Sequence, residues 1–156
     1  MEIPFISLEN LIDGSGEKVL KSLIEGKTII TSNNVDNQIV LKNLCKQSLR
    51  EILTFLNPEK ICALLEDFVI SIENSLCISY GNSDKLRIML HVACALERMI
   101  LNDGLEYKES PDTLNEKKLS ALNKASLLFK NSLSISLTND ELYYMVDILN
   151  EYKIWY

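Results

Sequence analysis

The sequence predicts an all-α fold, and three observations support this prediction. Apolar residues recur with helical spacing over most of the chain. Only 5 of the 156 residues are Gly and only 3 are Pro, which is too few for the many turns of a β-sandwich. Hydrophobic residues make up 47% and charged residues 24% of the chain, as in folded globular domains. We therefore expect a bundle of about five helices with a short helical N-terminal lead-in.

The first part of the chain, residues 1–34, is predicted to be a lead-in or linker. Two short helices are expected within it, at residues 8–12 and 17–25, and Gly26 ends the second of them. A run of polar residues then leads into the main domain. The helical domain is expected to cover residues 35–156.

Capping signals divide the main domain into five helical segments. Asn57 can cap the second helix, with Pro58 at its first position. Ser83 is predicted to cap the third helix, and Thr138 with Glu141 resembles a capping box at the start of the fifth. The five predicted helices cover residues 36–56, 58–76, 84–101, 115–133 and 139–150.

Charge and hydropathy exclude several classes of function. Sixteen Lys and Arg stand against 22 Asp and Glu, which gives a net charge of −6. Such a chain is a poor binder of the nucleic-acid backbone, so we expect no direct contact with nucleic acid. No apolar run approaches the roughly 18 residues of a membrane span, and no signal peptide opens the sequence. We therefore expect a cytoplasmic protein that does not enter a membrane.

The four cysteines are predicted to be small buried residues of the core. A zinc site needs closely spaced pairs of ligands, and a disulfide framework needs an oxidising compartment. Neither condition is indicated, and no glycine-rich phosphate loop or catalytic constellation is visible either. We expect no metal, no cofactor and no enzymatic activity. The cysteines lie 15 or 17 residues apart, at Cys45, Cys62, Cys77 and Cys94.

The predicted helix at residues 84–101 is apolar on most of its circumference, which is typical of a central helix in a bundle. A narrow polar strip separates its two apolar stripes. The only histidine of the chain lies on this strip, together with two of the three arginines. Glu97 interrupts one apolar face, and we expect it to pair with a lysine of a neighbouring helix in a structural role. The polar strip consists of Asp84, Arg87, His91, Cys94 and Arg98.

A histidine between two fixed cations suits phosphoryl transfer. The cations would depress the pKa of His91 and favour its neutral, nucleophilic form. The planar donors of Arg87 and Arg98 match the oxygens of a phosphoryl group. Transfer to a histidine nitrogen needs positioning and charge stabilisation above all. Spacing alone leaves two possibilities open: a phosphoryl acceptor, or a structural histidine satisfied by Asp84 or a backbone group. A metal site is disfavoured, because His91 and Cys94 supply only two ligands.

The run from His91 to Arg98, His-Val-Ala-Cys-Ala-Leu-Glu-Arg, resembles the His-x-x-Phe-Ala-x-x-Arg signature of PTS regulation domains, or PRDs. Cys94 replaces the usual Phe and resembles the variant of one subfamily, the sigma-54-dependent activators of the levanase-operon type. The stretch from residues 53–58 through Phe68 and Ile72-Glu73 is also similar to that subfamily, and the resemblance covers roughly residues 36–150. The opening Ile-Pro-Phe-Ile-Ser-Leu-Glu resembles the link after an enzyme II B-like domain. The chain is then expected to be the C-terminal regulatory fragment of a longer protein.

The resemblance implies an all-helical regulatory domain of a transcriptional regulator of carbohydrate utilisation, often dimeric. It implies that His91 is phosphorylated by a protein of the sugar phosphotransferase system (PTS), either the phosphocarrier HPr or an enzyme II B component. His91 and Arg98 carry over from the signature, whereas Arg87 comes from the helical wheel. Full PRDs usually carry a second histidine in the last helix, and residues 141–148 contain none, which fits a single-site domain. The alternative is a structural helical dimerisation module with an inert His91.

Overall fold

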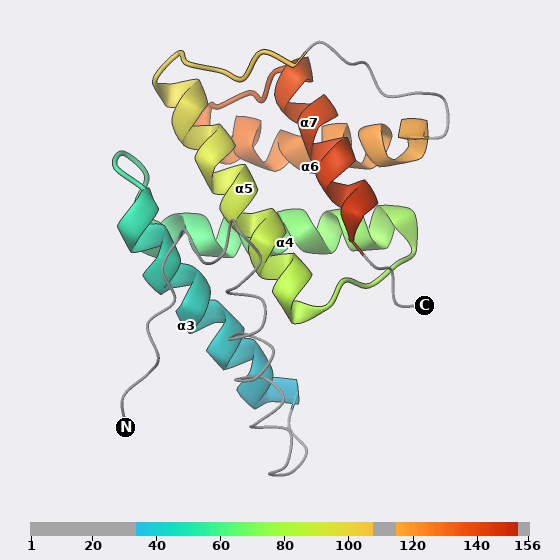
Figure 1. Cartoon of the computed structure of the whole chain (residues 1–156). Coiled ribbons are helices and arrows are strands. Elements are labelled where there is room, and N and C mark those ends of the chain that lie inside the picture. Colours follow the sequence, from blue (N-terminus) through green and yellow to red (C-terminus); the bar gives the residue numbers. More distant parts are fainter. Residues whose placement is uncertain (1–33, 108–114, 153–156) are drawn as a thin grey trace. The chain divides into compact units, whose positions relative to one another are not determined.

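The computed structural model describes residues 34–107 and 115–152 of the chain. Every regular element within these ranges is a helix, so the all-α prediction is confirmed (Figure 1). The lead-in of residues 1–33, with its two predicted short helices, lies outside the described residues. The five helices are α3 (Asn34–Ile52), α4 (Pro58–Leu76), α5 (Asn82–Ile100), α6 (Glu116–Leu133) and α7 (Asn139–Glu151).

The chain divides into two compact units, Met1–Leu44 and Cys45–Tyr156, and the boundary falls within α3. Within the second unit, α4 packs against α6 and α5 packs against α7, while α4 also contacts α5 and α6 contacts α7. Figure 1 shows α5 and α7 crossing over α4 and α6. No helix among the described residues is both long and apolar enough to cross a membrane.

The core of the second unit is built from apolar side chains of every helix in it. The rings of Phe68 on α4 and Phe129 on α6 meet with their centroids 5.1 Å apart. Burying one such large side chain contributes about 1.5–3 kcal/mol to folding. The largest fully buried side chains include Leu49, Ile61, Leu65, Phe68, Ile72, Leu86, Ile88, Leu96, Leu122, Phe129 and Met145.

Two of the three predicted caps are formed. The side chain of Asn57 accepts hydrogen bonds from the backbone N–H groups of Glu59 and Lys60, at 3.0 and 3.2 Å. The hydroxyl of Thr138 accepts one from the N–H of Glu141 at 3.4 Å. The prediction for Ser83 is wrong, because α5 begins at Asn82 after an extended Gly81, without a side-chain cap. The buried hydroxyl oxygen of Ser83 makes no hydrogen bond.

The helix predicted at residues 36–56 ends earlier, at Ile52, and Glu97 provides the physical reason. One carboxylate oxygen of Glu97, which is only 8% exposed, accepts three backbone N–H groups at 2.8–3.1 Å. These groups belong to residues 54–56, which would otherwise have continued the helix. The structural role expected for Glu97 is thus confirmed, but the expected lysine partner was wrong.

The prediction of buried cysteines holds for two of the four. Cys45 and Cys62 are buried, whereas Cys94 is half-buried and Cys77 is exposed. Cys77 occupies the C-cap of α4 with a left-handed φ of 54°, where the chain leaves the helix toward solvent. The prediction for Cys77 was therefore wrong, because its position is set by the helix end and not by an apolar face.

Candidate functional site

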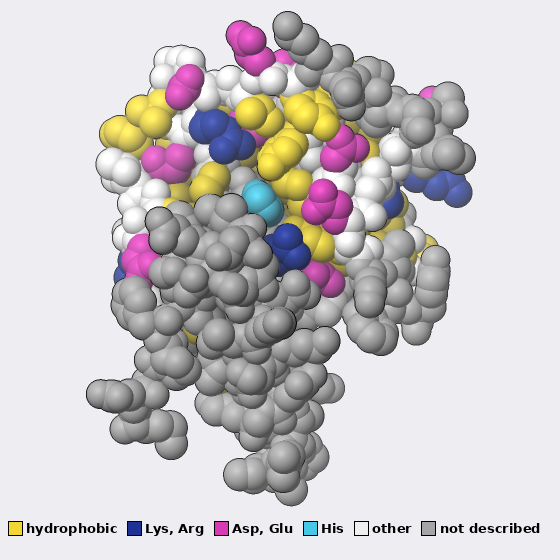
Figure 2. Space-filling model, viewed as in Figure 1, with side chains coloured by type: hydrophobic (Ala, Val, Ile, Leu, Met, Phe, Trp, Pro, Cys, Tyr) yellow, Lys and Arg dark blue, Asp and Glu magenta, His cyan; other side chains and the backbone are white. Residues whose placement is uncertain are grey.

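The helix α5 places the polar strip at the edge of the bundle. Both apolar stripes of the helical wheel are largely buried, with Leu86, Met89 and Ala93 on one and Ile88 and Val92 on the other. Each member of the polar strip is half-buried, from Asp84 to Arg98. Figure 2 shows the only histidine at the surface of this face, between basic side chains on either side of it. The predicted separation of apolar and polar faces on this helix is confirmed.

The environment of His91 favours its neutral form. Burial lowers the pKa of His91 most, and the positive charges of Arg87 and Arg98 lower it further. The carboxylate of Glu151 opposes this shift. The sequence predicted the contribution of the arginines but not the larger one of burial. Near neutral pH the imidazole therefore keeps one unprotonated, nucleophilic nitrogen.

Aromatic side chains hold the ring of His91 from the side of α7. Tyr144 meets His91 edge-to-face, with ring centroids 6.4 Å apart and an angle of 82° between the planes. Tyr107 packs on the same tyrosine at 5.6 Å, and its hydroxyl donates a hydrogen bond to the carboxylate of Asp147. These contacts restrict the orientation of the imidazole. The sequence analysis did not assign Tyr144 to the site, because only the tertiary fold brings α7 beside α5.

Arg87 lies one turn before His91 and is held by an aromatic ring. Its guanidinium carbon lies 5.1 Å from the centroid of the Tyr152 ring, in a cation–π arrangement. Tyr152 is 7% exposed and packs edge-on against Tyr80 at 6.3 Å. Among the ion pairs of the described residues, none involves Arg87.

Arg98, at the other end of the polar strip, is bound to a buried carboxylate. Its Nε and Nη2 donate to the two oxygens of Glu141 at 2.8 and 2.6 Å. Burial alone would raise the pKa of Glu141, but hydrogen bonds from Arg98 and the N–H of Leu105 bring it below its ordinary value. Glu141 in turn raises the pKa of Arg98. The Thr138–Glu141 capping box is therefore only half formed, because the glutamate side chain binds Arg98 instead of the N-cap backbone.

The sequence analysis missed Glu141 as a residue of the site. Its position three residues after Thr138 is fully accounted for by a capping box, so the local pattern gives no sign of a distant partner. Arg98 and Glu141 are 43 residues apart in the chain. Their pairing depends on the packing of α7 against α5.

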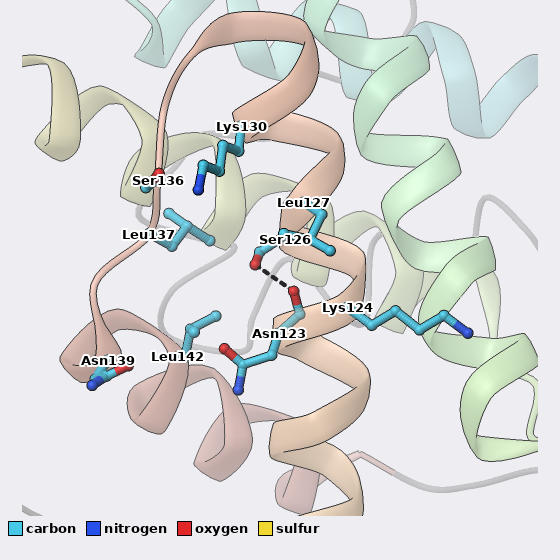
Figure 3. A pocket seen from close by; sticks show the side chains of 9 residues that line it. All are labelled: Asn123, Lys124, Ser126, Leu127, Lys130, Ser136, Leu137, Asn139 and Leu142. Atoms are coloured by element: carbon cyan, nitrogen blue, oxygen red, sulfur yellow. Dashed lines mark hydrogen bonds between the residues drawn. The ribbon is translucent and has the colours of Figure 1, made fainter.

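A separate concavity lies between α6, α7 and the segment that joins them, with a volume of about 380 Å³. Figure 3 shows Leu137 and Leu142 beside the polar side chains that line it. The hydroxyl of Ser126 donates to the carbonyl of Asn123 at 2.8 Å within this wall. The concavity contains no residue of the polar strip. No group of three His, Cys, Asp or Glu side chains among the described residues is arranged to hold a metal ion.

The arrangement on α5 can therefore receive an anionic group. It offers a neutral imidazole at the surface, a guanidinium on each side, and aromatic contacts that orient the ring. Attack by the unprotonated ring nitrogen on phosphorus needs little more than such positioning and charge stabilisation.

Comparison with known proteins identifies one matching domain family and two similar transcriptional regulatory proteins. Residues 66–152 match the model of the PRD domain. The chain is 27% identical over 151 residues to the transcriptional regulatory protein LevR of Bacillus subtilis (strain 168). It is 25% identical over 158 residues to the transcriptional regulatory protein DagR of Salmonella typhimurium (strain 14028s / SGSC 2262).

Each alignment covers 95% of this chain but only 16% of the relative, so the chain spans about one sixth of the length of these proteins. No solved structure matches the chain. The match to the PRD model extends from the middle of α4 to the end of α7, which is more than half of the sequence. This chain belongs to the PRD domain family.

Proposed function

We propose that this chain is the regulatory domain of a transcriptional regulator of carbohydrate utilisation, and that His91 accepts a phosphoryl group from a PTS protein. The donor is the phosphocarrier HPr or an enzyme II B component. Membership of the PRD family and two relatives named as transcriptional regulatory proteins support this proposal. The observation that carries it is the half-buried His91, of lowered pKa, between Arg87 and Arg98.

The reaction is a transfer between two proteins. The lone pair on the unprotonated nitrogen of His91 attacks phosphorus and forms the N–P bond. The bond between phosphorus and the donor breaks, and its electron pair stays with the donor. Arg87 and Arg98 stabilise the phosphoryl oxygens through charge-assisted hydrogen bonds. No catalytic base is required, because the attacking nitrogen of the neutral ring carries no proton.

The modification changes charge at the junction of two helices. A phosphoryl group adds about −1.5 to −2 charges near neutral pH. His91 contacts α7 through Tyr144, so this charge is introduced where α5 packs against α7. The regulator then reads the state of sugar transport as a change in helix packing or in association.

Intact-mass measurement tests the acceptor. The chain is incubated separately with phosphorylated HPr and with phosphorylated enzyme II B, and one arm should add the mass of one phosphoryl group. The added group should be lost in acid, as expected for an N–P bond. His91→Ala should abolish the gain, and Arg98→Ala should slow it. Cys94→Ser, which changes the next half-buried residue of the polar strip, is the matched control and should still be labelled. Labelling of His91→Ala would disprove the assignment, because the chain has no other histidine.

We also propose that the chain forms a homodimer through apolar side chains at the C-terminal end of α5. Leu101 is 54% exposed and Ile100 is 37% exposed there. Phe55, 57% exposed, belongs to the turn that Glu97 holds against the same helix. Apolar side chains that gather on a surface are typical of protein interfaces.

Light scattering coupled to size exclusion tests this interface. The unmodified chain should elute as a dimer, and Phe55→Ser with Leu101→Ser should shift it to the monomer. Leu127→Ser, at a 52% exposed position on α6, is the matched control and should leave the dimer intact. A monomeric unmodified chain would contradict the interface. A dimer whose His91 takes no phosphoryl group would favour the alternative of a structural dimerisation module.

A further inference from the structure

A buried carboxylate of α7 reaches across to the polar strip of α5. The side chain of Glu141 is 0% exposed, and each of its two oxygens accepts one hydrogen bond from Arg98. The N–H of Leu105 donates to the same carboxylate at 3.0 Å. Glu141 is also the third residue of α7, where the helix dipole favours negative charge. Two donors, Arg98 and the N–H of Leu105, therefore hold the carboxylate in place, and the helix dipole favours its charge.

The ion pair uses only one edge of the guanidinium. Arginine has five N–H donors in a planar fork, and Glu141 takes the edge formed by Nε and Nη2. The side chain of Arg98 remains 31% exposed. Among the described residues, Glu141 is the only hydrogen-bond or ion-pair partner found for this guanidinium. The opposite edge is thus left for another anion.

Helix α7 contacts two residues of the polar strip, His91 and Arg98. His91 meets Tyr144, and Arg98 meets Glu141, one turn earlier on α7. The histidine ring and the guanidinium are therefore placed relative to each other by two contacts with one rigid element. An arginine that is fixed in advance loses less conformational entropy when it binds an anion than a free one does.

We propose that Glu141 is a positioning residue for the phosphoryl transfer: it holds Arg98 so that the free edge of the guanidinium receives the phosphoryl oxygens at His91. This inference rests on the proposed function of His91. In this arrangement Arg98 stays paired with Glu141 after transfer. The carboxylate acts through the arginine and does not touch the phosphoryl group.

The test uses the full chain and potassium phosphoramidate, a small donor that transfers its phosphoryl group to imidazole nitrogen and releases ammonia. The rate of mass gain is measured below the unfolding transition of each variant, with circular dichroism as the check of folding. Glu141→Gln should lower the rate on the order of tenfold, because Gln no longer fixes the guanidinium as an ion pair. Glu141→Asp keeps the charge but shortens the reach, and it should lower the rate less. If the Glu141→Gln variant does not fold, the Glu141→Asp variant is compared with the unmodified chain instead.

A double-mutant comparison separates positioning from a purely structural role. In an Arg98→Ala background, Glu141→Gln should cause no further slowing, because the group through which Glu141 acts is already absent. Equal slowing in both backgrounds would overturn the inference, as would an unchanged rate for Glu141→Gln. Glu59→Gln removes the same charge from an exposed ion pair with Arg50, and it should leave the rate unchanged.

Hydrogen exchange then follows the ion pair itself. The amide of Leu105, which donates to Glu141, should exchange equally slowly before and after phosphorylation if the pair persists. Faster exchange after phosphorylation would show that the phosphoryl group draws Arg98 away from Glu141, and this would overturn the positioning role. If the unmodified chain gains no mass, the proposed function fails together with the inference. A gain in mass without any effect of Glu141 variants makes the inference alone fail.

Discussion

The ring of His91 combines partial exposure with surroundings that disfavour its protonated form. Burial and the two arginines act in the same direction, and only Glu151 opposes them. An acceptor histidine needs both properties, because a donor must reach the ring and the attacking nitrogen must be unprotonated. Tyr144 adds a third property by restricting how the ring turns.

The first prediction concerns the titration of this residue. Nuclear magnetic resonance should show one imidazole signal whose pKa lies below the ordinary value of about 6.5. Arg87→Met removes one of the positive charges that lower this pKa, so the pKa should rise. Arg50→Met removes a guanidinium that is not among the charges that shift the pKa of His91, and this control should leave that pKa unchanged. A pKa at or above the ordinary value would contradict the environment described for His91.

The lowered pKa of His91 should also make the free energy of unfolding depend on pH. Because the folded state has the lower pKa, the unfolded chain binds a proton to His91 more readily. The contribution of His91 to the free energy of unfolding is therefore complete above about pH 6.5 and is lost as the pH falls below this value. Urea unfolding at a series of pH values should show a smaller loss in His91→Gln than in the unmodified chain. An equal loss in both would mean that other groups cause it.

Among the elements, α4 and α5 show how differently two helices of equal length can begin. The side chain of Asn57 satisfies two backbone N–H groups at the start of α4, whereas the start of α5 has no side-chain cap. Gly81 adopts the extended conformation of an N-cap, and Ser83 falls inside the first turn. Local sequence signals were sufficient for α4 and misleading for α5, because both Gly81 and Ser83 are acceptable caps.

The second prediction compares these two positions. Asn57→Ala should lower the free energy of unfolding by about 1 kcal/mol, because two N–H groups lose their acceptor. Ser83→Ala is the matched control and should cost nothing, since its hydroxyl is buried without a hydrogen bond. Chemical denaturation of both variants measures the difference. A larger loss for Ser83→Ala than for Asn57→Ala would contradict the assigned caps.

For the molecule as a whole, the negative net charge disfavours binding to nucleic acid. The value of −6 disfavours the phosphate backbone of nucleic acid, and the arginines are few. Two of the three lie on the polar strip, at positions proposed to hold a phosphoryl group. Two of the three guanidinium groups of the chain thus lie on one helix, on either side of its only histidine.

The third prediction is that this chain does not bind DNA. A gel-shift titration should show no complex at micromolar concentrations of the chain and low salt, conditions that favour electrostatic binding. A basic DNA-binding domain serves as the positive control. Salt-sensitive binding by the isolated chain would contradict the prediction.

The sequence alone determined the helical fold, most helix boundaries and the polar strip that carries His91. These features depend on interactions within a few residues, such as the periodicity of apolar side chains and the caps at Asn57 and Thr138. Such interactions are present in the order of the residues, so they can be recognised before any packing is known. The resemblance of the His91–Arg98 run to the PRD signature likewise needed only consecutive residues.

The partners of the charged side chains were decided only by the tertiary structure. Glu97 binds backbone groups 41–43 residues away, and Arg98 binds Glu141 at a separation of 43 residues. The order of residues does not show which segments so far apart will meet in the folded chain. The burial of His91 likewise depends on which helices pack against α5. A carboxylate that leaves water must find hydrogen-bond donors wherever the packed chain presents them. The fold therefore decided which donors those were, and with them how Arg98 is held on the polar strip.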